Sequence, residues 1–188
     1  MRLRPAFPLR RLALLALGAA AVAACTPALN WREFSMPPSR LLALMPCKPD
    51  EAMRSVQLDG RAVDMHLAGC DAGGATFVVG WLAVAPPGQV GPLLGAWQDA
   101  TLTQAGIAAG PDAPAGRAFV PPGALAVPQS VRLAAQGRHP DGKPLALQAA
   151  WFAAGGGTTP QALFAAVYGD LPAGGDAADT FFAGLRLQ

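Results

Sequence analysis

The chain has 188 residues, of which 52% are hydrophobic and 14% are charged, with a formal net charge of +2. This length is enough for one domain with a real core. The absence of a basic cluster and the low aromatic content argue against a nucleic-acid-binding protein. The 22 glycines and 19 prolines predict many short elements joined by turns rather than long helices.

The N-terminus has the three parts of a bacterial export signal. Four basic residues precede an apolar run over 12–24 that is too short to span a bilayer; they are Arg2, Arg4, Arg10 and Arg11. The run ends in Val22-Ala23-Ala24-Cys25, which resembles the processing site of bacterial lipoproteins. We therefore expect a signal peptide over 1–24, cleavage between Ala24 and Cys25, and acyl chains such as palmitate on Cys25. The alternative is a short buried helix that ends in a cysteine.

Lipidation at Cys25 predicts where the protein works. Two or three acyl chains hold a protein stably on a membrane, so the lipid is the only anchor that we expect. Thr26 follows the cysteine, and the absence of Asp at this position favours the periplasmic face of the outer membrane in a Gram-negative cell. Removal of 1–24 leaves 10 basic and 12 acidic side chains, so the mature chain is slightly acidic.

Two cysteines remain once Cys25 is acylated. In an oxidising compartment an even pair of this kind usually forms a disulfide, so we expect a bond between Cys47 and Cys70. Closing this loop contributes roughly 3 kcal/mol on the chain-entropy model. A metal site is the alternative, but the chain has only two histidines and no Cys-x-x-Cys spacing. We expect no metal and no cofactor.

The mature chain begins with an expected lipidated flexible tether over 25–38, which has three prolines and no clear periodicity. Trp31 in this segment has two interpretations. It lies at the level of the lipid head groups, which tryptophan favours, or it packs back on the domain. A single α+β domain is expected over 39–188.

The first half of this domain predicts strands and then a helix. A two-residue hairpin is indicated by Asp59-Gly60, where both residues tolerate positive φ. The segment 61–69 alternates between apolar and polar residues, as expected for a strand with one buried face. Val90, Leu93, Leu94 and Trp97 have the spacing of an amphipathic helix that runs to about Gly106. The expected strands here are 40–45, 53–58, 61–69 and 75–85, the last of them central.

The second half returns to strand character and ends in a helix. Turns are indicated at Asp141-Gly142 and at Gly155-Gly156-Gly157. The helix over 173–183 has Asp176 and Asp179 near its start, which the helix dipole favours. The expected fold is an antiparallel β-sheet with two helices packed on it. The expected strands of this half are 117–120, 130–136, 145–154 and 161–168, with an extended piece at 185–187.

Three stretches of the chain resemble the PsbP-like family of small exported proteins. They are 44–49 (LMPCKP), the strand 75–85 with the helix that holds Leu94 and Trp97, and 176–187 (DAADTFFAGLRL). The resemblance implies an α/β/α sandwich, with Cys47 where glycine is usual, as in a disulfide-bearing subgroup. The members are assembly factors, accessory subunits or proteins of unknown role, which implies action through protein contacts. No matched residue is catalytic.

Candidate active-site residues are few. No serine of the mature chain lies in a Gly-x-Ser-x-Gly motif. His66 and Asp64 share the polar face of one predicted strand and have the chemistry of an oriented base, but no nucleophile accompanies them. His139 lies in a predicted turn. Trp81, Trp97 and Trp151 are candidates for a ligand cage, although their apolar surroundings favour core positions.

Taken together, the sequence predicts a membrane-anchored envelope lipoprotein without catalytic activity. The expected role is that of an accessory or assembly protein with an unidentified envelope protein as its partner. A carrier of a small molecule or lipid, with its pocket between sheet and helices, is the alternative. An envelope hydrolase is the third hypothesis.

Overall fold

The computed structural model describes residues 29–155, 159–169 and 176–188. The predicted signal peptide, the Ala24–Cys25 cleavage site and the lipidated Cys25 lie outside the described residues. No described helix has the length and apolar character needed to cross a membrane.

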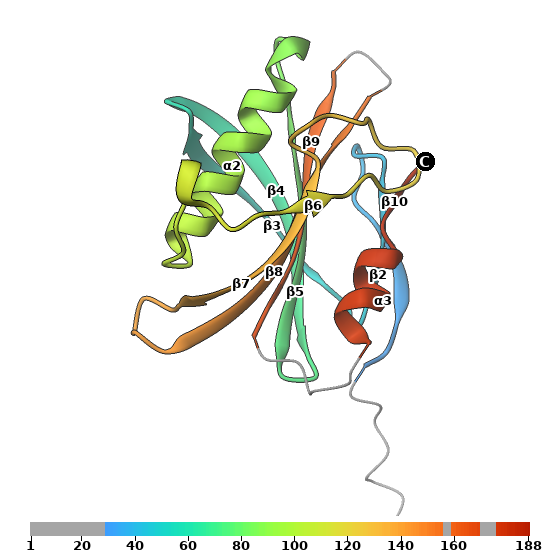
Figure 1. Cartoon of the computed structure of the whole chain (residues 1–188). Coiled ribbons are helices and arrows are strands. Elements are labelled where there is room, and N and C mark those ends of the chain that lie inside the picture. Colours follow the sequence, from blue (N-terminus) through green and yellow to red (C-terminus); the bar gives the residue numbers. More distant parts are fainter. Residues whose placement is uncertain (1–28, 156–158, 170–175) are drawn as a thin grey trace, which may run out of the picture.

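A twisted seven-stranded antiparallel sheet forms the centre of the molecule (Figure 1). Its strand order is β3-β4-β5-β9-β8-β7-β6, so that β5 is an interior strand and β9 is the middle one. The strands are β3 (Asp50–Leu58), β4 (Arg61–Ala72), β5 (Ala75–Ala83), β6 (Arg117–Ala118), β7 (Val131–Arg138), β8 (Pro144–Ala154) and β9 (Gln161–Tyr168).

Tight turns set the register of the hairpins. Asp59 and Gly60 have φ of 51° and 70° and join β3 to β4, so that Leu58 faces Arg61. This is the two-residue turn that the sequence predicts, because both positions need positive φ. The Asp141-Gly142 turn between β7 and β8 is also present, with Gly142 donating its N–H to the carbonyl of His139 at 2.8 Å.

The helix α2 (Val90–Gln104) covers one face of this sheet and follows a short 3-10 turn at Pro87–Gln89. The predicted apolar stripe is buried against the sheet. The core on this face also contains Leu82, Trp151 and Phe164 from the strands. A second 3-10 turn, Gly110–Asp112, lies in the connection to β6.

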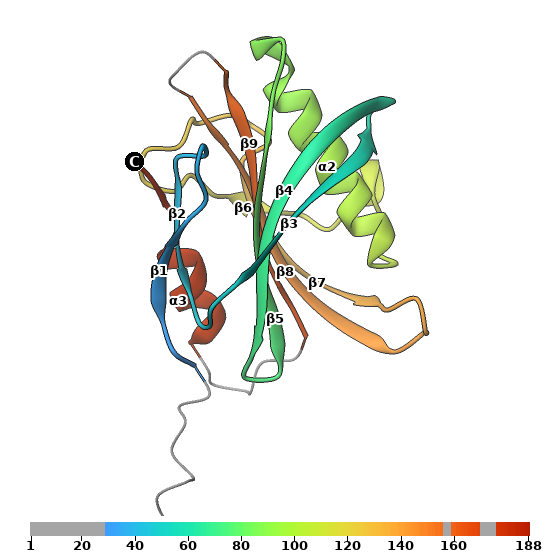
Figure 2. The same cartoon turned by 180° about the vertical axis from the view of Figure 1, so that it is seen from behind.

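The opposite face carries the helix α3 (Ala177–Ala183) and a small sheet (Figure 2). This sheet has the order β1-β2-β10 and consists of β1 (Arg32–Ser35), β2 (Leu41–Met45) and β10 (Arg186–Leu187). Phe181 and Phe182 of α3 are buried beside Phe77 and Phe152 of the large sheet. The two faces thus have separate cores, and the fold is α+β with two helices on an antiparallel sheet, as predicted.

The expected tether over 25–38 requires a correction. Four of its residues form β1, which pairs with β2 in antiparallel register from Arg32 opposite Met45 to Ser35 opposite Leu42. Trp31 packs edge-to-face against Phe77 with a ring separation of 6.2 Å, so it packs on the domain. A strand of four residues is too short to show alternation, so no pattern within it indicates it.

Candidate functional site

A groove open to solvent lies between the C-terminal half of α2 and the large sheet. It consists of two hollows, of about 440 and 340 Å³, which adjoin because they share four lining residues. The shared residues are Val78, Thr101, Gln104 and Tyr168. We use "the groove" for these two hollows together.

The groove exists because the side chains along α2 change in size. The first turns present Leu93, Leu94 and Trp97, all buried, which fill the space above the sheet. Farther along, the helix lines the groove with Ala100, Thr101 and Gln104, and the small side chains of the first two leave that space open. Interior packing is normally dense, so an open apolar space of this size is a candidate binding site.

The larger hollow is mostly apolar. Strands β3, β4, β5 and β9 form its floor and one wall, and α2 forms the other wall. Arg54 and Gln57 are the polar residues of β3 at this end. The apolar lining residues are Val56, Leu58, Met65, Leu67, Val78, Trp97, Ala100 and Phe164.

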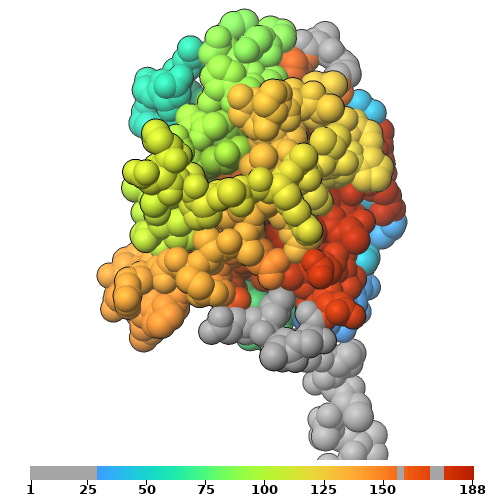
Figure 3. All heavy atoms as spheres, in the orientation of Figure 1, coloured from blue at the N-terminus to red at the C-terminus, as the bar shows by residue number. Residues whose placement is uncertain are grey.

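The smaller hollow lies where the C-terminus of α2 meets the β7–β8 hairpin. Arg138, His139 and Pro140 of the hairpin line it, and all three are exposed. The backbone ties the hairpin to the helix, because Arg138 donates its N–H to the carbonyl of Ala105 at 2.8 Å. Gly137 permits this approach, since a Cβ there would lie 2.1 Å from the same carbonyl oxygen. Figure 3 shows the hairpin projecting below the end of α2.

Tyr168 is one of the hydrogen-bonding groups at the junction of the two hollows. Burial raises the pKa of its phenol to about 12, so the side chain is neutral at physiological pH. Its hydroxyl makes no hydrogen bond to any other described residue, whereas the neighbouring Thr101 hydroxyl donates to the carbonyl of Trp97 at 2.8 Å. The groove therefore presents a neutral phenol within a mostly apolar space.

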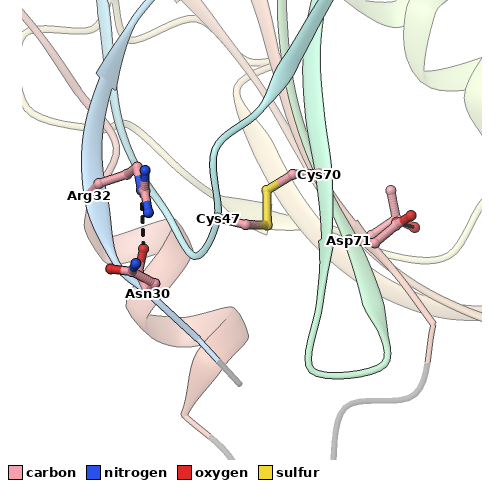
Figure 4. The surroundings of a disulfide bond; sticks show 6 residues. Asn30, Arg32, Cys47, Cys70 and Asp71 are labelled. Carbon is pink, nitrogen blue, oxygen red and sulfur yellow. Dashed lines mark hydrogen bonds between the residues drawn. A yellow bond between two sulfur atoms is a disulfide. The ribbon is translucent and has the colours of Figure 1, made fainter. Parts of the chain in front are cut away.

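The predicted disulfide is present. Cys47 follows β2 and Cys70 lies on β4, with their Cα atoms 6.0 Å apart (Figure 4). The bond therefore joins the chain leaving the small sheet to the large sheet. Asn30 and Arg32 lie near it, and Arg32 Nε donates to the carbonyl of Asn30 at 3.4 Å.

The structure places the candidate base His66 in a packing role. Its ring stacks on Trp81 with a centroid distance of 4.2 Å and an interplanar angle of 4°. Asp64 is exposed and makes no ion pair within the described part of the chain. A small pocket beside His66, of about 210 Å³, has no hydroxyl or thiol among its lining residues. His139 lies in the hairpin turn, as predicted.

The three candidate cage tryptophans do not share a cavity. Trp81 lies in the core beneath α3, while Trp97 and Trp151 lie in the core beneath α2. All three are buried, and Trp97 alone also lines the groove. The core interpretation therefore holds for the group. Among residues 29–155, 159–169 and 176–188, no three His, Cys, Asp or Glu side chains cluster as metal ligands.

Sequence reasoning missed a contact that holds α3 on the sheet. Arg132 of β7 is buried and donates to both Gln148 Oε1 and Asp179 Oδ1 at 2.8 Å. Its guanidinium carbon also lies 4.0 Å from the centre of the Phe182 ring. In the sequence, Asp179 indicates only a favourable helix start. Its partner Arg132 is 47 residues away, so no local pattern shows this contact.

Comparison with known proteins identifies no relative. No family model matches the chain, and neither a curated protein nor a solved structure matches it.

Proposed function

We propose that this chain is an exported lipoprotein of the cell envelope that binds an apolar small molecule or lipid chain without transforming it. The observation that supports the proposal is the groove between α2 and the large sheet. Its hollows, of about 440 and 340 Å³, have the size of small-molecule sites, and its mostly apolar lining with few polar groups has their composition. We place the ligand in this groove.

The N-terminal sequence supports the same role. Acyl chains on Cys25 would keep the groove close to a membrane surface, where apolar molecules concentrate. The slightly acidic mature chain carries no basic cluster for a nucleic acid. We therefore propose an outer-membrane location on the periplasmic side, and a role as a carrier between the membrane and its surroundings. Under this proposal, the PsbP-like resemblance describes the scaffold and not the ligand.

Action through protein contacts is the second candidate function, and the open edge of β3 favours it. This nine-residue strand pairs with β4 alone among the described strands. An edge of this kind can accept an extended segment of a partner. However, β3 carries Asp50, Glu51 and Arg54, and charged side chains commonly protect edges from pairing. The large exposed apolar side chains are also divided between β3 (Met53) and the β6–β7 connection (Val120, Leu125).

Native mass spectrometry of the full chain tests the proposal. The protein is extracted in a steroid-based detergent, which has no linear alkyl chain to compete, and is titrated with 1-dodecanol. We expect a one-to-one complex that Val78→Phe weakens at least tenfold, because Val78 lines both hollows and a phenyl ring would fill their junction. Val120→Phe is the matched control, since Val120 is exposed and lies outside the groove.

Two results would count against binding in the groove. One is the absence of any complex with dodecanol or decanol. The other is a complex that both valine variants retain equally. A reproducible cross-link to one envelope protein from Met53 on β3, in the absence of any such complex, would favour the second candidate function.

A further inference from the structure

The two ends of the groove differ in chemistry, and this difference bears on the ligand. We infer that the ligand is a single-chain amphiphile with an anionic head group, bound with its head beside Arg138 and its tail toward Trp97 and Phe164. This inference rests on the proposed function, because it names the class of ligand for the same groove.

The tail end is defined by the larger hollow. Six apolar side chains from the sheet and two from α2 account for most of its lining residues, with the indole of Trp97 and the ring of Phe164 5.2 Å apart. The volume of about 440 Å³ corresponds to one drug-sized molecule, and hence to one alkyl chain rather than a diacyl lipid. Burial of each methylene group there contributes to binding through the hydrophobic effect.

The head end is defined by donors that have spare capacity. Arg138 uses Nη1 for a 3.2 Å hydrogen bond to the carbonyl of Gly142, which leaves other N–H groups of the guanidinium. Gln104 and Tyr168 lie between Arg138 and the apolar end, and neither side chain has a hydrogen-bond partner in the described residues. A guanidinium with neighbouring neutral donors suits a carboxylate or phosphate group.

Two carboxylates lie near this end, and both already have partners. Asp141 forms an ion pair with Lys143 at 2.8 Å, and the hydrogen bonds from Lys143 lower the pKa of that carboxyl. Asp71 accepts a 2.5 Å hydrogen bond from the Thr76 hydroxyl. Neither aspartate lines the groove, whereas Arg138 does. The charge that a ligand head meets inside the smaller hollow is therefore positive.

The opposite end of the groove also has a cationic side chain, that of Arg54. The head group of the ligand must therefore be assigned to one of the two ends. Arg54 is exposed on the edge strand β3. In that strand, the lining residues nearest to it are Val56, Gln57 and Leu58. Of the six residues that line the smaller hollow alone, three are polar, namely Thr76, Arg138 and His139. Of the nine that line the larger hollow alone, only Arg54 and Gln57 are polar. This asymmetry points the head toward the β7–β8 hairpin.

The test compares three probes of equal chain length on the full chain in the steroid-based detergent: dodecanoate, 1-dodecanol and dodecyltrimethylammonium. Native mass spectrometry gives the dissociation constant of each. We expect dodecanoate to bind roughly three- to fivefold more tightly than dodecanol, the range for a partly exposed charge pair, and the ammonium to bind most weakly. Arg138→Gln should remove the preference for dodecanoate and leave dodecanol binding unchanged.

Two further variants make the result specific. Arg54→Gln should retain most of the preference, and Arg117→Gln, on β6 outside the groove, should retain all of it. Equal affinity for the three probes would overturn the head-group inference while leaving the proposed function intact. Loss of the preference in Arg54→Gln but not in Arg138→Gln would overturn the orientation. Failure of all three probes to bind would overturn the proposed function itself.

Discussion

Tyr168 offers a direct spectroscopic measurement at the centre of the groove, because it is the only tyrosine in the chain. Burial raises its pKa to about 12, compared with about 10 for an exposed phenol. We predict that tyrosinate absorbance near 295 nm appears with a midpoint near pH 12 in the folded protein. In urea the midpoint should fall to about 10. A midpoint near 10 in the folded protein would contradict the buried position of the phenol.

The same shift predicts a dependence of stability on pH. The folded state holds the phenolic proton more tightly, so the unfolded state loses its proton first as the pH rises. The stabilisation is fully present below pH 10 and is lost between pH 10 and about 12, by roughly 2–3 kcal/mol in total. Urea unfolding between pH 9 and 11.5 should show this loss in the native protein, and Tyr168→Phe should lack that part of the slope.

Arg132 is the residue whose replacement should most disturb α3. Arg132→Met removes the hydrogen bonds to Gln148 and Asp179 and the contact with the ring of Phe182. We predict a loss of roughly 1–3 kcal/mol in the free energy of unfolding. Asp179→Asn should cost less than about 1 kcal/mol, because the side chain of Asp179 is 76% exposed. Equal effects of the two variants on urea unfolding would show that the ion pair alone accounts for the contact.

At the scale of elements, the disulfide fastens the small sheet to the large one. Cys47 and Cys70 are separated by 23 positions, and closing that loop restricts the unfolded chain. We predict that the Cys47→Ser/Cys70→Ser double variant loses roughly 2–4 kcal/mol of stability. Differential scanning calorimetry of the exported protein should show a lower Tm, and reduction of the native protein should match the double variant. An unchanged Tm would contradict a stabilising role.

The elements that the sequence predicted well are those with local signals. The hairpin at Asp59-Gly60 needs only two residues that tolerate positive φ, and α2 needs only the spacing from Val90 to Trp97. The strand β1 was missed because its four residues gain their structure from β2. Neither the strand order, with β9 between β5 and β8, nor the Arg132–Asp179 contact follows from neighbouring residues. The alternative hypothesis of a carrier placed a pocket between sheet and helices, but the residues that line the groove could not be predicted, since its walls combine α2 with strands far apart in the sequence.

At the scale of the whole molecule, the proposed lipid anchor on Cys25 determines where the protein is located, whereas the groove determines what it binds. Cys25→Ala should prevent acylation, so that the full chain no longer receives the lipid. We predict that the variant keeps its signal peptide or leaves the outer-membrane fraction, while the folded domain and its disulfide are retained. Intact mass and membrane fractionation measure both effects. A variant that remains in the outer membrane at the mass of the acylated protein would contradict lipidation at Cys25.

The central claim is that an alkyl chain occupies the groove between α2 and the large sheet. Photolabelling of the full chain with a diazirine-bearing fatty alcohol, followed by peptide mapping, tests it most directly. The account predicts labels on α2 beyond Trp97 and on the facing strands β3, β5 and β9, and predicts that Val78→Phe removes them. Labels confined to the α3 face or to the open edge of β3, and unchanged in Val78→Phe, would contradict it.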